Sequence, residues 1–116
     1  MLPNKHRLRK QKDIERVWKE GKSSLANGLR VKVVFNKLGA TRFCFIVPAS
    51  IESRAAARNL FKRRLREAAR CLLPRINSSY DIIIYLYRKP ADISYASFFE
   101  ALEKNLILAE LAANET

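Results

Sequence analysis

Basic residues recur at every fourth position between residues 54 and 70, and this spacing places side chains about one turn apart along an α-helix. The row consists of Arg54, Arg58, Lys62, Arg66 and Arg70. An arginine guanidinium donates hydrogen bonds in a fork that matches two phosphate oxygens, so a row of such groups is suited to a polyanion. The chemistry that this segment predicts is phosphate binding.

The same segment also carries an apolar stripe. It consists of Phe61, Leu65, Ala68 and Leu72. On a helix these side chains fall within about 60° of one another. The adjacent arc holds Arg58, Asn59, Lys62, Arg63, Arg66 and Arg70. A solvated surface helix usually interleaves acids with its bases, but the only acid between Arg54 and Arg75 is Glu67. The pattern therefore favours a nucleic-acid partner over a merely solvated face.

Groups that could perform catalysis are scarce. His6 is the only histidine and is expected to be exposed, and Asp13 and Glu15 would lie on different faces of a helix. Cys44 and Cys71 form no metal-binding spacing and are expected to be buried thiols in a reducing cytoplasm. The sequence therefore predicts a binding protein without its own catalytic or metal centre.

Length and charge indicate one basic domain. The chain has 116 residues and a net charge of +12, of which residues 76–116 contribute −3. We expect a single domain over 1–116, with residues 1–10 as an extended basic arm that is either a solubilising tail or a phosphate-binding segment. No apolar run approaches the ~20 residues needed to span a bilayer, and the N-terminus lacks the apolar core of a secretory signal. These features predict a cytoplasmic protein.

Periodicity predicts an α+β fold, a compact two-layer α/β sandwich. The expected elements are a helix over 11–20, a weakly indicated strand over 22–26, strands over 29–35 and 41–47, and a strand over 82–87. Two further helices are expected, one capped by Ser50 or Ser53 that runs to about Leu73 and one capped by Ser94 that runs to about Ala112. The strands over 29–35 and 41–47 are expected to pair as an antiparallel hairpin. The continuous apolar run over 82–87 predicts a strand covered on both faces.

A second cationic surface is expected on the open side of strand 29–35. Arg30 and Lys32 alternate there with apolar residues. Trp18, in the first helix, is expected either to be core or to provide a stacking platform for an unpaired base. Phe35 and Phe45 are open to the same two interpretations.

The stretch Arg58-Asn59-Leu60-Phe61-Lys62-Arg63-Arg64-Leu65-Arg66-Glu67 resembles the signature of the protein subunit of bacterial ribonuclease P. The flanking matches are Arg7-Leu8-Arg9-Lys10, residues 13–21, Phe43 to Val47, residues 80–84 and Ser94-Tyr95, in the family's order. The sequence departs from the family pattern at Leu60 and at Pro48-Ala49-Ser50, where the family has basic residues.

The resemblance implies a ribosomal-protein-like α-β-β-β-α-β-α sandwich with a left-handed β-α-β crossover. It implies a protein that does not cleave by itself: the RNA subunit holds the Mg²⁺ ions and removes the 5′ leader from precursor tRNA. The implied partners are the ribonuclease P RNA and the leader, with no membrane and no obligate protein partner.

The resemblance and the charge pattern together predict two binding surfaces. The residues expected to contact the RNA subunit are Arg54, Arg58, Asn59, Lys62, Arg63, Arg66 and Arg70. The residues expected to line a leader cleft between the first helix and the sheet are Arg16, Trp18, Arg30, Lys32 and Phe35.

Three other functions compete with this interpretation. A generic RNA-binding or ribosomal-type protein would need the basic helix but no leader cleft. An autonomous nuclease would need catalytic groups that the sequence lacks. Binding to an anionic membrane is the third use of positive charge.

Overall fold

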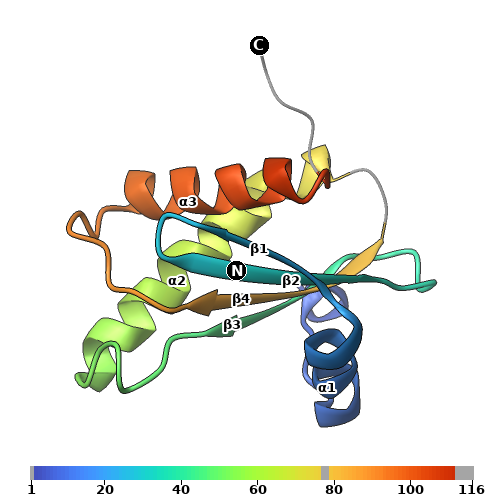
Figure 1. Cartoon of the computed structure of the whole chain (residues 1–116), viewed down its shortest axis with the longest axis horizontal. Coiled ribbons are helices and arrows are strands. Elements are labelled where there is room, and N and C mark those ends of the chain that lie inside the picture. The colour runs from blue at the N-terminus through green and yellow to red at the C-terminus, as the bar shows by residue number, and fades with distance from the viewer. Residues whose placement is uncertain (1, 77–78, 112–116) are drawn as a thin grey trace.

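The computed structural model describes residues 2–76 and 79–111 and contains three α-helices and one sheet (Figure 1). In chain order the elements are a 3₁₀ turn η1 (Asn4–His6), α1 (Gln11–Glu20), β1 (Lys22–Ala26), β2 (Leu29–Phe35), β3 (Arg42–Ile46), α2 (Ala55–Leu72), a 3₁₀ turn η2 (Leu73–Arg75), β4 (Tyr80–Leu86) and α3 (Tyr95–Leu108). The predicted α+β class and element order are confirmed, including the short strand over 22–26.

The sheet has the strand order β1-β2-β4-β3, and only β3 and β4 are parallel. The predicted hairpin between strands 29–35 and 41–47 is therefore wrong, because β4 lies between them. Ile82, Ile83 and Ile84 are all fully buried, so β4 takes the central position that covers both of its faces. Helix α2 connects β3 to β4 and completes the β-α-β unit that the family resemblance implies, whose left-handed sense stays a prediction.

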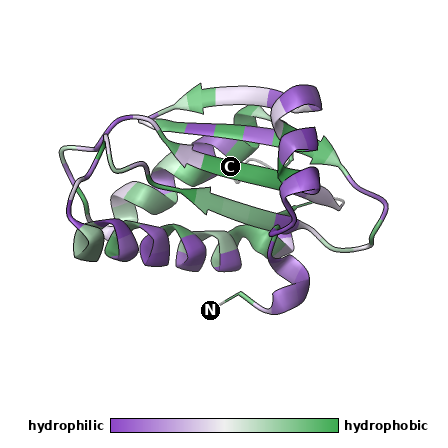
Figure 2. Cartoon of the chain, turned by 90° about the horizontal axis from the view of Figure 1, so that it is seen from below, coloured by the Kyte–Doolittle hydropathy of each residue, from purple (hydrophilic) through white to green (hydrophobic). Residues whose placement is uncertain are grey.

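The helices cover opposite faces of the sheet. Figure 1 shows α3 above the sheet and α1 below it, and Figure 2 views the sheet from the α1 side with α2 running along one edge. The main core joins both of the larger helices to the sheet, with Phe61 and Leu102 packed in the same cluster as Ile84. A smaller cluster of Leu8, Val17 and Ile83 seats α1 on the other face.

Residues 2–10 pack against the protein, so the prediction of an extended arm is wrong for this described part of it. Leu2 and Leu8 are buried, and the Leu8 N–H donates to the Phe43 carbonyl at 2.8 Å. The His6 Nδ1 atom lies 2.7 Å from the Thr41 carbonyl oxygen, so His6 is half-buried rather than exposed. Two leucines among the charges suffice to fix the segment along β3.

The two longer helices begin differently. Helix α2 has Arg54 at its N-cap with no side-chain cap, so the predicted cap at Ser50 or Ser53 is wrong. The Glu52 carboxylate instead accepts the Arg54 N–H at 3.0 Å. Helix α3 has the predicted cap, since Ser94 Oγ accepts the Ser97 N–H at 3.3 Å. Helix α3 ends at Leu108, before the predicted end at Ala112, which lies outside the described residues.

A tight turn at Asn27-Gly28 joins β1 to β2. Both residues have positive φ, 52° and 84°, as the mirror-image turns of two-residue hairpins require. A Cβ atom on Gly28 would lie 2.7 Å from the Arg88 carbonyl oxygen. Glycine is therefore required at this position both by the backbone conformation and by the close approach of the loop after β4.

Candidate nucleic-acid interface

The stripe predicted to bury α2 is confirmed, and it fixes the direction in which the basic residues point. Phe61, Leu65, Ala68 and Leu72 are all at most 1% exposed. At about 100° per residue, an arc of about 100° on the far side of the helix holds five polar residues. We call Asn59, Lys62, Arg63, Arg66 and Arg70 the α2 basic face. Arg54 and Arg58 lie outside it, on the side of the buried stripe.

Intramolecular contacts divide the cations of this helix. Arg54 pairs with Glu52 at 3.1 Å and Arg70 pairs with Glu67 at 2.5 Å. Arg58 donates to the main-chain carbonyls of Glu52 and Ser53 at 3.0 and 2.8 Å. Arg64 donates to the main-chain carbonyl of Ile93. Within the described residues, no hydrogen bond or ion pair holds the three cations that remain, which are Lys62, Arg63 and Arg66. These three are the groups most available to an external anion.

Hydrogen bonds from basic side chains lower the pKa of two carboxylates, Glu67 on this helix and Glu52 just before it. The hydrogen bond from Arg70 lowers the pKa of Glu67. Hydrogen bonds from Arg54 and then Lys89 hold the pKa of Glu52 well below its usual range. Arg54 and Arg70 are therefore partly neutralised by partners within the chain, which the sequence pattern alone did not indicate.

A second group of side chains meets between α1 and the sheet. The Trp18 ring packs edge-on against Tyr85 with centroids 5.9 Å apart, and Lys32 Nζ lies 5.4 Å from the Trp18 ring centroid. Arg30 is exposed and is the direct cross-strand partner of Tyr85. We call Trp18, Arg30, Lys32 and Tyr85 the α1–sheet face. Tyr85 was not predicted, because it lies within the continuous apolar run of β4. Period-two alternation could have placed its side chain on one face of the sheet, but its position opposite Arg30 follows from the strand register.

Arg16 is held by contacts that seat α1 on the sheet. It donates to the Phe35 carbonyl at 2.9 Å and lies 3.7 Å from the fully buried Asp81 carboxylate. Asp81 also accepts two hydrogen bonds from Arg42, at 2.8 and 2.7 Å, and one from Asn36 at 2.8 Å. The bond to Asp81 raises the pKa of Arg42 against the opposing effect of burial. Arg16 is therefore partly committed to the fold.

Phe35 does not join the α1–sheet face. Its position in β2 places its side chain on the same face as Val31 and Val33, the face that α2 and α3 cover. There it packs edge-on against Tyr80 at 6.0 Å between ring centroids, although it remains 51% exposed. The structure therefore brings Trp18, Arg30 and Lys32 together and leaves Phe35 on the opposite side of the sheet.

The described residues offer little for catalysis or metal binding. No group of three or more His, Cys, Asp or Glu side chains among residues 2–76 and 79–111 could hold a metal ion. Cys44 is half-buried, and burial raises the pKa of its thiol while nearby Lys62 opposes that shift. Cys71 is exposed, so the prediction of two buried thiols is wrong for Cys71. None of the helices in the described part of the chain has the length and apolar character to cross a membrane.

Comparison with known sequences finds one family over nearly the whole chain. The family model described as Ribonuclease P matches residues 2–110. The ribonuclease P protein component of a Picosynechococcus strain is 30% identical over 110 residues, covering 95% of both chains. That of Pelotomaculum thermopropionicum is 34% identical over 104 residues, covering 90% of this chain and 92% of its own.

Comparison with solved structures gives the same result. The ribonuclease P protein of Staphylococcus aureus superposes with a TM-score of 0.83 at 26% identity, covering 93% of this chain and 98% of its own. The ribonuclease P protein of Thermotoga maritima superposes with a TM-score of 0.67 at 26% identity, covering 95% of this chain and 98% of its own. Similarity in sequence and similarity in fold thus each extend over most of the chain.

Proposed function

Because the chain belongs to the ribonuclease P family and has the role of its protein component, we propose that it uses two separate surfaces. The α2 basic face binds the RNA subunit, and the α1–sheet face binds the 5′ leader of precursor tRNA. The chain is the non-catalytic part of an endoribonuclease. The observation that carries the proposal is the set of three exposed or half-exposed cations on α2 that have no partner within the described chain.

The α2 basic face is suited to a folded RNA because its backbone is fixed in advance. The buried stripe holds the helix against the core, so binding orders only the side chains of Lys62, Arg63 and Arg66. These cations can replace condensed counterions on the RNA, and the affinity should therefore fall as salt rises. Position 60, where the family has an arginine, holds a leucine whose side chain is half-buried. This position therefore adds no charge to the surface of the helix.

The α1–sheet face is suited to a single strand. Trp18 offers a ring for base stacking, with Tyr85 packed at its edge, and Arg30 and Lys32 offer charges for the adjoining phosphates. Only precursor tRNA has a 5′ leader, so contacts at this face favour the precursor over the mature product. Arg16 contributes chiefly by seating α1, whereas Phe35 lies on the opposite side of the sheet and is not part of the proposed leader surface.

Magnesium belongs, on this proposal, to the RNA subunit, where it supplies the catalytic chemistry. The chain's cations screen the RNA phosphates and allow Mg²⁺ to bind at a lower concentration. The protein acts in the cytoplasm with RNA partners alone, without a membrane and without an obligate protein partner.

Reconstitution tests this function. The purified chain is combined with a bacterial ribonuclease P RNA at limiting Mg²⁺, and cleavage and affinity are measured for precursor and mature tRNA. We expect cleavage at lower Mg²⁺ than for the RNA alone, and tighter binding of precursor. Equal affinity for the two tRNAs would favour a generic RNA-binding protein over a leader guide.

Two further assays separate the other classes of function. Cleavage of precursor tRNA by the chain and Mg²⁺ without any RNA subunit would indicate an autonomous nuclease. Co-sedimentation with anionic vesicles that persists in the presence of ribonuclease P RNA would indicate membrane binding. We expect neither result.

A further inference from the structure

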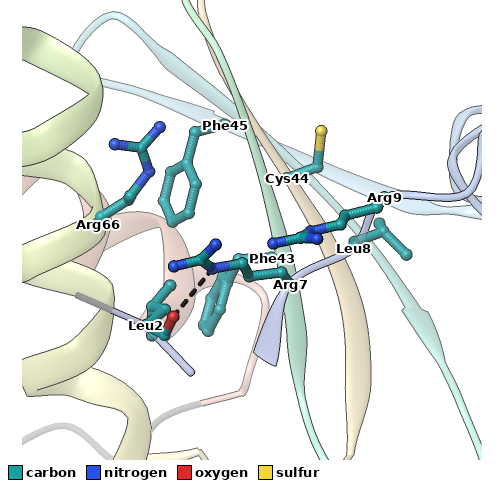
Figure 3. Close-up of a pocket in the computed structure, with 8 residues that line it drawn as sticks. All are labelled: Leu2, Arg7, Leu8, Arg9, Phe43, Cys44, Phe45 and Arg66. Carbon is teal, nitrogen blue, oxygen red and sulfur yellow. Dashed lines mark hydrogen bonds between the residues drawn. The ribbon is translucent and has the colours of Figure 1, made fainter. Parts of the chain in front are cut away.

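A cavity of about 430 Å³ opens where the N-terminal segment, β3 and α2 meet (Figure 3). Its lining residues are Leu2, Arg7, Leu8, Arg9, Phe43, Cys44, Phe45 and Arg66. This volume lies within the range of about 300–1,000 Å³ that is typical of small-ligand sites. Neither the α2 basic face nor the α1–sheet face explains the cavity, and only Arg66 is shared with the former.

Three guanidinium groups surround the cavity, and none of the described residues that line it carries a carboxylate. Arg7 donates through Nε to the Leu2 carbonyl at 2.9 Å, and Arg9 donates to the Asn4 side chain at 3.1 Å. These contacts are with neutral acceptors, so they orient the arginines without cancelling their charge. Figure 3 shows Arg66 entering from α2 on one side and the two N-terminal arginines from the other. Like charges arranged in this way repel one another until an anion binds between them.

The remaining wall is apolar and aromatic. The half-buried Phe45 ring stacks on Phe43 with centroids 5.9 Å apart and 22° between the planes, and Phe43 is only 2% exposed. Phe43 thus supports Phe45 from the core side, while Phe45 lines the cavity. A supported aromatic ring beside cations is the arrangement on which unpaired bases stack in single-strand binding proteins.

We propose that this cavity receives one unpaired nucleotide of the RNA subunit, with its base against Phe45 and its phosphate between Arg9 and Arg66. The ligand must combine a flat apolar surface with negative charge, and a nucleotide has both. This inference rests on the proposed docking of the RNA subunit on α2, and it adds a site where that RNA is held by a base as well as by its backbone.

The position of the cavity selects the RNA subunit over the tRNA leader. Arg66 belongs both to the cavity and to the α2 basic face, so an RNA docked on α2 reaches the opening directly. The α1–sheet face is centred on β2, and β4 separates β2 from β3. A leader bound at Trp18 therefore lies across the sheet from Phe45.

The test measures affinity for a bacterial ribonuclease P RNA, without tRNA, for the full chain and three variants over a range of salt concentrations. Phe45→Leu removes the ring and keeps an apolar side chain; Arg9→Ala removes one cation without touching the core. Lys19→Ala is the control, because Lys19 is exposed on α1. Base-specific chemical probing of the RNA is performed on each complex.

We expect Phe45→Leu to lower affinity about five- to tenfold at every salt concentration, because stacking is uncharged. Arg9→Ala should lower affinity and reduce the slope of log affinity against log salt by about 0.7 to 0.9. Lys19→Ala should match the unmodified chain. Probing should reveal one unpaired base that is protected by the unmodified chain and by Lys19→Ala, and exposed with Phe45→Leu.

Two results would overturn the nucleotide site and leave α2 docking intact. One is wild-type affinity for both Phe45→Leu and Arg9→Ala; the other is the absence of any base whose protection depends on Phe45. Thermal unfolding identifies a Phe45→Leu protein that has lost its fold, in which case Arg9→Ala and its footprint decide. Failure of the unmodified chain to bind the RNA at all would instead refute the proposed function.

Discussion

The α2 basic face and the contacts that seat α1 on the sheet use the same kinds of cation in different situations. On α2, Lys62, Arg63 and Arg66 have no partner within the described residues. Around α1, Arg16 and Arg42 converge on the buried Asp81 carboxylate. A cation that pairs with a buried acid is used to hold the fold, and a cation that makes no such contact is available to a ligand.

Net charge therefore overstates how many cations a binding surface can offer to a ligand. Asp81 is fully buried and would be costly without its donors, so the nearest arginines are committed to it. Lys32 is intermediate between the two cases, because its ammonium donates to the Trp18 carbonyl at 2.6 Å while lying beside the Trp18 ring. Contacts within the chain, rather than the number of positive residues, determine which cations can reach RNA.

The largest effect is expected when the α2 cations are reversed. Lys62→Glu with Arg66→Glu should weaken binding to ribonuclease P RNA by several kcal/mol at low salt, at about 2 kcal/mol for each charge-assisted contact. The measurement is the dissociation constant for the RNA subunit at low and high salt, and the loss should shrink as salt increases.

The matched control makes the same change in charge on α1. Lys12 and Lys19 are both exposed there, so Lys12→Glu with Lys19→Glu alters net charge equally and leaves α2 intact. We expect this variant to lose far less affinity for the RNA subunit. Equal losses in the two variants would mean that overall charge, and not the α2 basic face, drives binding.

The next largest effect concerns stability and tests the structural half of the comparison. Asp81→Ala leaves Arg42 and Asn36 without their acceptor, and it should lower the free energy of unfolding by about 3 kcal/mol. Urea denaturation measures this loss. The control is Glu20→Gln, which removes an exposed partner 3.9 Å from Arg16 and should cost about 0.5 kcal/mol or less. Similar losses for the two variants would contradict the division between structural and available cations.

Sequence patterns predicted the fold where local periodicity is strong. The four apolar residues of α2 and the Ser94 cap of α3 are placed as predicted, because each depends on residues within a few turns of the chain. The strand pairing was wrong, because the position of β4 between β2 and β3 follows from burial in three dimensions. The Asn27-Gly28 pair is a hairpin signal in the sequence that the prediction of a strand over 22–26 did not use.

The sequence indicates which residues have the type of side chain that could bind RNA, but it does not show which of their charges are available. Charge counting cannot show that Glu52 and Glu67 pair with Arg54 and Arg70, since side-chain geometry decides each pair. The packed position of residues 2–10 was missed for a similar reason. Two buried leucines outweigh the neighbouring charges there, and the cavity beside Phe45 exists only because the segment is held against β3.

A smaller effect is expected at the α1–sheet face. Trp18→Ala should lower the preference of the assembled particle for precursor over mature tRNA by about five- to tenfold, through loss of one stacked base. Its affinity for the RNA subunit alone should not change. Competition between precursor and mature tRNA measures the preference. Thermal unfolding is the control, because Trp18 also packs against Tyr85. A folded variant with unchanged preference would place the leader elsewhere.

The smallest effect distinguishes a paired cation from an available one on the same helix. Glu67→Gln removes the acid that holds Arg70, and it should raise affinity for the RNA subunit by about threefold or less, since exposed pairs are weak. The increase should be greatest at low salt and absent in a chain that also carries Arg70→Gln, because Arg70 is then no longer available to be released. The dissociation constants of the single and double variants measure it. An increase that survives Arg70→Gln would show that Glu67 acts by repelling RNA directly. An increase that depends on Arg70 shows that pairing within the chain limits the affinity of this end of the α2 basic face for RNA.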